Sequence, residues 1–269
     1  MGNILDQIVA HKRTEVAADR EALPLAIIQR EISKLPPTRS LSKVLRKPGE
    51  VALLAEIKKA SPSKGVIRAD FDAVEIAKIY TQAGAAAISV LTDHKFFQGS
   101  PDYLRQVREV TNLPLLRKEF IIDAYQIYQA RLLGADAILL IAGLLETPQL
   151  VRFQELAGEL GLECLVEVHT EAELAKARAI GAKLIGINNR DLTVFKTDLH
   201  TTIRLKSLIT DPEVIVVSES GINTRADVLL LAQHGVDAML VGEALMRQGD
   251  VAAQLAYLLK DQPAAKVVG

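Results

Sequence analysis

Charged side chains stand where a buried strand should end. Residues 51–55 form an apolar run of the length and composition of a buried strand, and Glu56 and Lys58 follow it. These two residues are two positions apart, so in a strand their side chains point to the same face. Opposite charges on one face of a hydrophobic strand are costly if they are buried without function. The pattern indicates the rim of an active site.

Three further apolar runs end in the same way, at Lys118, Glu167 and Glu219. Lysines and carboxylates that are crowded together shift one another's pKa values. Such a group supplies proton donors and acceptors near neutral pH, which is what general acid–base catalysis needs. Any one of these residues could be an ordinary solvated loop residue, but a set that repeats at strand ends is harder to explain in that way.

Small and polar residues follow several of these runs. Residues 61–65 form a turn-rich loop that contains Ser61, and Gly221 and Gly242 follow the last two apolar runs. Glycines allow a ligand to approach the backbone closely, and barrels often bind phosphate at their last two loops. Glu243 stands oddly beside an anion, although its backbone N–H could still contribute.

A repeat positions these residues. Gly84, Gly134, Gly181 and Gly235 recur at intervals of about 50 residues, each followed by a short apolar strand, which is the length of two strand–helix units. The strands lack polar alternation, as expected for a parallel sheet that is buried on both faces. Eight strands alternating with eight helices predict a (β/α)8 TIM barrel. A doubly wound sheet would not be expected to repeat so evenly, and the chain has no nucleotide-binding glycine motif.

The barrel prediction places the charges together. Counting strands along the chain, Glu56, Lys118, Glu167 and Glu219 end the first, third, fifth and seventh. Alternate strands of such a barrel supply one layer of inward side chains, so these four should meet at the carboxyl-terminal mouth. The predicted strands at 113–117, 162–168 and 213–218 are those that place Lys118, Glu167 and Glu219 at the mouth, and predicted helices lie at 70–83, 103–110, 124–133, 147–160 and 171–180.

The first 50 residues precede any convincing strand. Asn3 could cap a first helix, Pro24 suits the start of a second helix that runs to about residue 33, and residues 41–45 suit a short helical turn. We predict three parts: an N-terminal helical extension packed on the barrel (1–50), the barrel (51–260) and a C-terminal tail (261–269). The extension and the loop at 61–68 could cover the mouth and exclude water.

The composition excludes several classes of protein. A formal net charge of -1 over 269 residues argues against non-specific binding of nucleic acid or of acidic membranes. The single cysteine, Cys164, allows no disulfide within the chain and suits a small buried hydrophobe. No signal peptide or apolar run of membrane-spanning length is evident, so we expect a cytoplasmic protein. No metal-ligand spacing is present, and we interpret His169 as a rim or capping residue.

The motifs resemble those of the indole-3-glycerol phosphate synthase family, and the resemblance covers nearly the whole chain. The matching segments are residues 4–12, 56–65, 89–92, 96–100, 116–121, 187–192, 218–222 and 242–246. The resemblance implies a TIM barrel with an N-terminal helical extension, without cofactor or metal. It also implies the substrate 1-(2-carboxyphenylamino)-1-deoxyribulose 5-phosphate, which is converted to indole-3-glycerol phosphate, carbon dioxide and water in tryptophan biosynthesis.

The resemblance also implies roles. Lys118 is similar to the general acid for ring closure, and Lys58 to the lysine that binds the substrate carboxylate and can act as an acid in the later dehydration. Glu56 and Glu167 match acid–base carboxylates, whose division of labour stays open. The remaining matches are Asn188, Arg190, Glu219 and Ser220 in the pocket, Ser61, Gly221, Gly242 and Glu243 at the phosphate, and Phe97, Phe120 and Leu139 against the aromatic ring. Position 243 is serine in some relatives.

Other functions are compatible with a phosphate-binding barrel. A sugar-phosphate isomerase, or a lyase that forms a Schiff base with Lys118, is the nearest enzymatic alternative. A non-catalytic barrel that binds a phosphorylated ligand is another, although it would be expected to lose its charged strand ends. For the synthase, we expect a phosphorylated small molecule as partner, no nucleic acid, no membrane, and a monomer or a weak homodimer.

Overall fold

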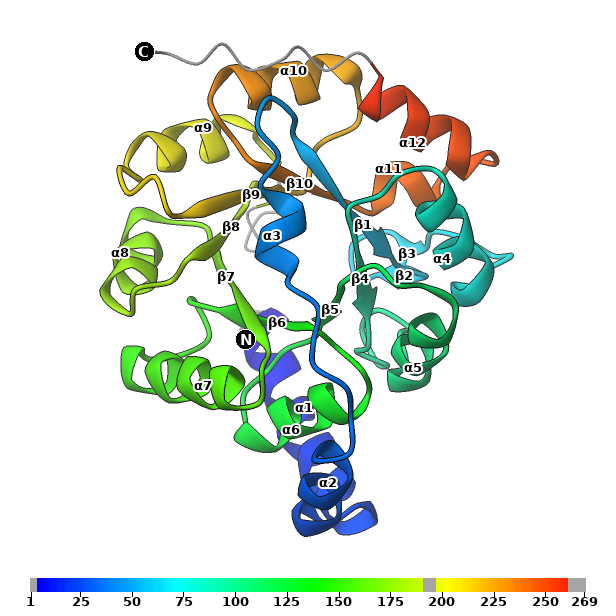
Figure 1. Ribbon diagram of the computed structural model, residues 1–269, viewed down its shortest axis with the longest axis vertical. Helices are drawn as coiled ribbons and strands as arrows, with labels where there is room; N and C mark the ends of the chain where they lie inside the picture. Colours follow the sequence, from blue (N-terminus) through cyan, green and yellow to red (C-terminus); the bar gives the residue numbers. More distant parts are fainter. Residues whose placement is uncertain (1–3, 191–196, 261–269) are drawn as a thin grey trace.

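The chain folds into a closed parallel barrel (Figure 1). The computed structural model describes residues 4–190 and 197–260, and within these ranges eight strands close the barrel, with β10 returning to pair with β1. The TIM barrel prediction is confirmed. The strands are β1 (Ala52–Ile57), β4 (Ala87–Leu91), β5 (Leu115–Lys118), β6 (Ala137–Ile141), β7 (Glu163–Val168), β8 (Leu184–Asn188), β9 (Ile215–Glu219) and β10 (Ala238–Val241).

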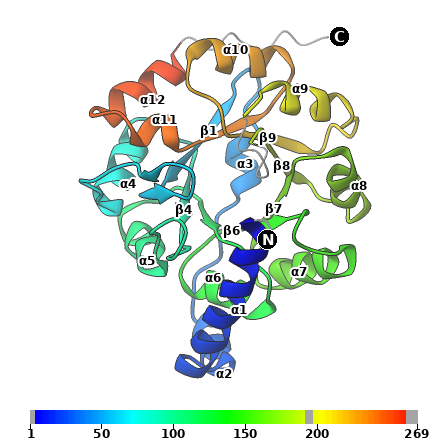
Figure 2. The same cartoon turned by 180° about the vertical axis from the view of Figure 1, so that it is seen from behind.

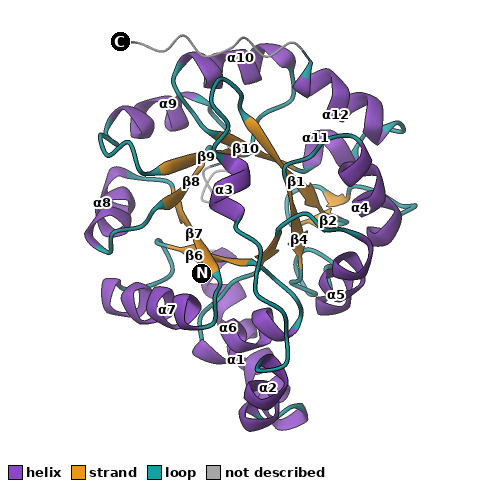
Figure 3. Ribbon diagram, in the orientation of Figure 1, coloured by secondary structure: helices purple, strands orange, loops and turns teal. Residues whose placement is uncertain are grey.

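A ring of helices surrounds the strands (Figure 3). The predicted helix at 70–83 begins later, at Ala73, because the Asp72 carboxylate caps it by accepting from the backbone N–H groups of Val74 and Glu75. These helices are α4 (Ala73–Gln82), α5 (Pro101–Val110), α6 (Ala124–Leu132), α7 (Thr147–Glu159), α8 (Glu171–Ala179), α9 (His200–Ser207), α10 (Arg225–Gln233), α11 (Glu243–Met246) and α12 (Val251–Leu259). None of the described helices is long and apolar enough to cross a membrane.

The repeated glycines end helices, as predicted. Gly84, Gly134, Gly181 and Gly235 follow α4, α6, α8 and α10 with φ of 93°, 87°, 68° and 66°. This left-handed conformation is open to glycine at little steric cost, and it turns the chain from a helix into the next strand. The 50-residue period in the sequence therefore reflects one helix end in every second unit.

Apolar side chains fill the middle of the barrel. Leu54, Leu116, Leu139, Leu165 and Leu240 belong to one buried cluster inside it. A second, larger cluster lies between the strands and the outer helices. The strands are therefore buried on both faces, which is why their sequences lack polar alternation. Two positions past Leu54, Leu116 and Leu165, strand alternation brings Glu56, Lys118 and Glu167 to the same inward face.

The N-terminal extension contacts both ends of the barrel. The short helix α3 (Leu41–Leu45) crosses the end where the strands begin (Figure 1), and Leu41 and Leu45 are buried in the inner cluster. The long helix α1 (Ile4–Ala22) lies on the opposite face (Figure 2), where Lys12 contacts the segments that follow β4 and β5. The helix α2 (Leu25–Ile32), which lies between α1 and α3 in the sequence, packs on α6. Asn3 and the tail at 261–269 lie outside the described residues.

These buried contacts give the extension a structural role. Val16 and Ile28 pack with Tyr125 of α6 in a separate hydrophobic cluster. A cover that only closed the mouth would not need such anchoring. The division into extension, barrel and tail stays a prediction, as does closure of the mouth by the extension.

The polar loop predicted at 61–65 forms a small hairpin. Strands β2 (Ala60–Ser61) and β3 (Gly65–Val66) pair antiparallel, with Gly65 at φ 66°. Within it Ser61 is buried, whereas Gly65 and Val66 are exposed. The hairpin leaves the carboxyl-terminal end of β1 and so stands beside the mouth.

We predict that Asp136→Ala destabilises the fold. Asp136 is buried at the entry to β6, where its carboxylate accepts from the backbone N–H groups of Arg39 and Leu115 at 2.7 and 2.8 Å. It also pairs with half-buried Arg108 at 2.8 Å, so its removal takes away the carboxylate partner of that cation. We expect the free energy of unfolding in urea to fall by about 3 kcal/mol. Asp102→Ala, which breaks the exposed pair of Asp102 with Arg105, is the control. An equally small effect of Asp136→Ala and Asp102→Ala on the free energy of unfolding would contradict the prediction.

Candidate active site

A cavity of about 500 Å³ opens at the carboxyl-terminal end of the barrel. It is lined by the ends of the strands and by the loops that follow them, which is where barrel enzymes carry their active sites. Fourteen of the fifteen site residues that the sequence predicts line it, as counted among the described residues: Glu56, Lys58, Phe97, Lys118, Phe120, Leu139, Glu167, Asn188, Arg190, Glu219, Ser220, Gly221, Gly242 and Glu243.

Lys118 lies between two carboxylates. Its ammonium nitrogen is 3.2 Å from Oε2 of Glu167 and forms a short contact with Oε2 of Glu219. Lys118 and Glu219 belong to the strands themselves, and strand alternation turns their side chains into the barrel. Burial would lower the pKa of Lys118, but the charges of Glu219 and Glu167 outweigh it and raise that pKa above its usual range. The lysine is therefore held as an ammonium ion.

The pKa values of the two carboxyl groups are shifted in opposite directions. Burial raises the pKa of Glu219 to about 7, and the negative charge of Glu167 adds to this against the opposing effect of Lys118. Burial acts on Glu167 as well, but Lys118, His169 and a hydrogen bond from Asn188 together lower its pKa. When the pKa values of two neighbouring carboxyl groups are driven apart, one group can stay a carboxylate while the other carries a proton.

A second ion pair stands beside this cluster. The Lys58 ammonium lies 2.6 Å from Oε2 of Glu56, and both side chains are largely buried. The negative charge of Glu56 also acts on Lys118 and Glu219. Strands β1, β5, β7 and β9 are the first, third, fifth and seventh strands of the barrel along the chain. They contribute charged groups to one cavity, as the alternate-strand argument predicts.

Two glycines make room for the carboxylates. A Cβ placed on Gly186 of β8 would collide with Oε1 of Glu219, and one placed on Gly242 would collide with Oε2 of Glu56. Gly242 was predicted from its place in a phosphate loop, whereas Gly186 was missed. A glycine inside a strand indicates close approach by another group, and that signal in the run 184–188 could have found it.

Phe97, Phe120 and Leu139 form an apolar wall of the cavity, which we call the aromatic wall. It lies across the barrel from the loops that follow β9 and β10. The rings of Phe97 and Phe120 are 6.0 Å apart between centroids at an interplanar angle of 39°. Leu139 of β6 is buried and also lines the cavity. Together they offer an apolar surface for a planar ring.

The loops after β8, β9 and β10 bring polar groups to the mouth. Arg190 pairs with Glu243 at 3.0 Å, and Arg247 pairs with the same carboxylate at 2.8 Å. Ser220 and Gly221 both have positive φ, of 68° and 83°. A non-glycine residue in this conformation is uncommon and is found at functional turns. Here it turns the chain sharply after β9, so the backbone faces the cavity.

Ser61 stands apart from the other fourteen predicted residues. It lies in β2 and is buried, its hydroxyl has no hydrogen-bond partner among the described residues, and it does not line the cavity. Its neighbours Ser63 and Lys64 do line the cavity, as do Asn223 and Arg247, which sequence reasoning missed. The turn-rich loop thus contributes to the cavity through Ser63 and Lys64, and phosphate binding by Ser61 stays a prediction. Asp191 and Leu192 of the matching segment 187–192 lie outside the described residues.

The arrangement suits acid–base chemistry on a small anionic ligand. An ammonium, a carboxylate and a second carboxyl with a pKa near neutral converge beside an apolar wall. His169 follows β7, where its ring nitrogens lie 3.7 Å from Glu167 and 3.4 Å from Glu173. Within residues 4–190 and 197–260, no group of three His, Cys, Asp or Glu side chains is arranged to hold a metal ion.

Comparison with known proteins shows which family the chain is similar to. The model of the family described as indole-3-glycerol phosphate synthase matches residues 5–258. Proteins of that name are similar along their whole length: one from Legionella pneumophila (strain Paris) is 50% identical over 97% of this chain and 100% of its own, and one from Dehalococcoides mccartyi (strain CBDB1) is 52% identical over 95% and 100%. A relative from Rhodopirellula baltica is 50% identical over 95% and 98%.

A solved structure shares the fold at much lower identity. The thiamine phosphate pyrophosphorylase from Pyrococcus furiosus superposes with a TM-score of 0.59 over 78% of this chain and 94% of its own, at 17% identity. At this identity the likeness concerns the barrel alone.

We predict that Gly186→Ala displaces Glu219. The new methyl group would occupy the space of the Glu219 carboxylate, which must then leave Lys118. We expect turnover to fall by about tenfold or more, on the scale of a misplaced acid–base group. Gly158→Ala in α7, where an added Cβ meets nothing within 4 Å, is the control and should leave turnover unchanged. Equal activity of both variants would contradict this account of Gly186.

We also predict that Glu219 makes stability depend on pH. Its pKa is raised on folding, so folding favours the protonated form, and this contribution is full below about pH 4.5 and is lost as pH rises through about 7. The wild type should therefore lose stability relative to Glu219→Gln between pH 5 and pH 8, measured by urea unfolding. The exposed Glu171→Gln is the control and should show no such difference. A difference of the opposite sign would contradict the assignment.

Proposed function

The chain belongs to the indole-3-glycerol phosphate synthase family and carries out that family's reaction, and we propose that the ionic cluster around Lys118 performs it. The reaction closes the indole ring of 1-(2-carboxyphenylamino)-1-deoxyribulose 5-phosphate and releases carbon dioxide and water, as part of tryptophan biosynthesis. It makes the chain a carbon–carbon lyase. The observation that carries the proposal is the convergence of Lys118, Glu167 and Glu219 beside an aromatic wall.

Lys118 would act as the general acid for ring closure. The ring carbon that bears the carboxylate attacks the ketone carbon, and negative charge develops on the ketone oxygen. An ammonium held between Glu167 and Glu219 can stabilise that charge and transfer a proton to it. The raised pKa of Lys118 keeps the proton available over the whole physiological range.

The later steps need a base and a second acid. Loss of carbon dioxide from the quaternary ring carbon leaves its bonding electrons in the ring system, and a proton and a hydroxide then leave as water to restore aromaticity. Glu219 and Glu56 are carboxyl groups within the same cavity, and Lys58 is held beside Glu56 to protonate the departing hydroxyl. Glu167 is the more strongly ionised carboxylate and would keep Lys118 in place between turnovers.

Binding at two ends would fold the substrate for this attack. Arg190, released from Glu243, can bind the carboxylate, while the backbone after β9 and β10 can bind the phosphate. The aromatic ring would then lie against Phe97 and Phe120. Fixing both ends of a flexible ligand brings the ring carbon to the ketone and removes much of the entropic cost of closure.

A Schiff-base lyase is the alternative that the same lysine suggests. Such an enzyme needs an unprotonated lysine as nucleophile, usually with a lowered pKa. The two carboxylates around Lys118 raise its pKa instead, which favours the acid over the nucleophile. A cytoplasmic location, and a monomer or a weak homodimer, stay predictions.

The direct test follows product formation by its own fluorescence. The chain contains no tryptophan, so indole emission on addition of the substrate reports the product against a background of 5 tyrosines. We expect indole emission and an equal amount of released carbon dioxide. Lys118→Ala should lower turnover by about 10²-fold or more, the scale of lost general acid catalysis, and leave the circular dichroism spectrum unchanged.

Two results would contradict the proposal. Near-full activity of Lys118→Ala would remove that lysine from the chemistry. A covalent adduct trapped by borohydride in the wild type, and absent from Lys118→Ala, would favour the Schiff-base alternative. Lys176→Ala is a matched control, because that lysine lies on the outer helix α8 and binds backbone carbonyls of the barrel without lining the cavity.

A further inference from the structure

A buried lysine of the N-terminal extension joins two loops of the barrel mouth. Lys12 of α1 is 3% exposed, and its ammonium nitrogen lies 3.0 Å from Oδ2 of Asp93 and 3.0 Å from Oε1 of Glu119. Asp93 follows β4 and Glu119 follows β5, so the two carboxylates come from neighbouring loops. Glu15, one turn along α1, holds the same nitrogen at 2.8 Å.

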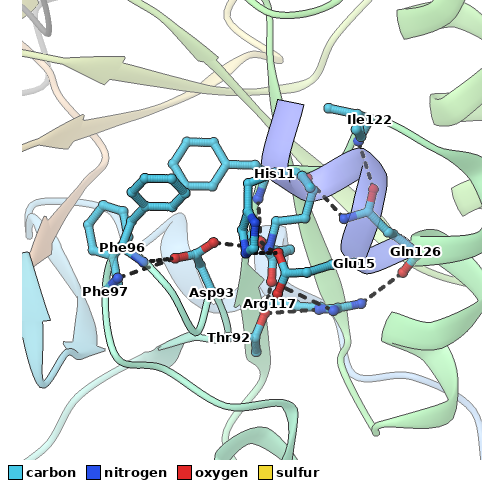
Figure 4. Close-up of polar contacts among 12 residues, drawn as sticks. His11, Glu15, Thr92, Asp93, Phe96, Phe97, Arg117, Ile122 and Gln126 are labelled. Atoms are coloured by element: carbon cyan, nitrogen blue, oxygen red, sulfur yellow. Dashed lines mark hydrogen bonds and ion pairs between the residues drawn. The ribbon is translucent and has the colours of Figure 1, made fainter. Parts of the chain in front are cut away.

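Each of the two carboxylates also holds the backbone of a cavity-lining phenylalanine. Figure 4 shows the Asp93 carboxylate turned toward the segment of Phe96 and Phe97, and its Oδ1 accepts from their backbone N–H groups at 2.7 and 3.2 Å. Oε1 of Glu119 accepts from the backbone N–H of Phe120 at 2.9 Å. The two aromatic residues of the wall are thus bound to the two carboxylates that Lys12 bridges.

The electrostatics make Lys12 necessary to this arrangement. Asp93 is fully buried and Glu119 nearly so, and two carboxylates in such a place repel strongly without a cation between them. Arg117 lies 3.8 Å from the other oxygen of Glu119, and its other N–H groups bind Thr92, Gln126 and Gln129. Burial would lower the pKa of Lys12, but Glu119 and Asp93 raise it above its usual range, so the bridge stays charged.

We infer that Lys12 is a positioning residue for the active site, which fixes the aromatic wall by holding Asp93 and Glu119 together. The inference rests on the proposed function, because it assigns the wall to the aromatic ring of the ligand. The new element is that the N-terminal extension, through Lys12, determines the affinity for that ring. Lys12 itself does not line the cavity, and it acts through the two carboxylates.

Two phosphorylated ligands separate positioning of the wall from general stability. Indole-3-glycerol phosphate carries the ring, and glycerol 3-phosphate shares its phosphate end without the ring. In Lys12→Met we expect the affinity for indole-3-glycerol phosphate to fall about tenfold, the scale of one lost aromatic packing contact, with affinity for glycerol 3-phosphate unchanged within twofold. Indole fluorescence measures the first and phosphorus NMR titration the second. Lys12→Arg, which keeps the charge, should recover part of the loss.

Arg20→Met is the matched control for attachment of α1. Arg20 lies two turns along the same helix, is half-exposed, and pairs with Asp123 of the barrel without contact to Asp93 or Glu119. It should change neither affinity. The inference is overturned if Arg20→Met matches Lys12→Met, or if Lys12→Met weakens both ligands equally or neither.

A charge-balanced variant guards against misfolding of Lys12→Met. The double substitution Lys12→Met with Glu119→Gln restores the net charge of the cluster without restoring the bridge. If Lys12 positions the wall, thermal stability should recover while the affinity for indole-3-glycerol phosphate stays low. Recovery of both would overturn the inference and leave Lys12 a purely structural residue. A wild type that binds no indole-3-glycerol phosphate would instead contradict the proposed function.

Discussion

The candidate active site depends on one buried ion cluster, in which Lys118 lies between Glu167 and Glu219. Three charges removed from water are tolerable only when each has a partner, and an unpaired carboxylate would take up a proton instead. The cluster therefore keeps Lys118 as an ammonium ion and gives Glu219 a pKa of about 7. The barrel supplies what the cluster needs, which is a rigid frame that sets neighbouring strands in fixed register.

The surroundings of the cluster are built around this requirement. Gly186 and Gly242 leave room for the carboxylates of Glu219 and Glu56, where any larger residue would collide with them. Asn189, whose side chain donates to the backbone carbonyls of Glu219 and Ser220 at 3.0 Å, supports the sharp turn after β9. Uncharged residues thus determine where the charged groups stand.

The extension is part of the same construction. It covers the entry end of the barrel through α3 and reaches the mouth through α1, so one segment of the chain contacts both ends of the closed sheet. A second buried cation, Lys12, stands there among carboxylates as Lys118 does inside the barrel. Both clusters use the same physics, in which a buried ammonium ion holds together acidic groups brought from different strands or loops.

The sequence by itself determined the eightfold repeat, the inward charges at alternate strand ends and the family, because strand alternation and helix-ending glycines are local patterns. It could not show that Ser63 and Lys64 line the cavity, because that depends on how the hairpin folds beside the mouth. Only the tertiary structure decided that Gly186 faces Glu219, that Lys12 bridges Asp93 and Glu119, and that the two carboxyls of the cluster differ in pKa. These depend on distances and burial between segments far apart in the chain, which no local pattern encodes.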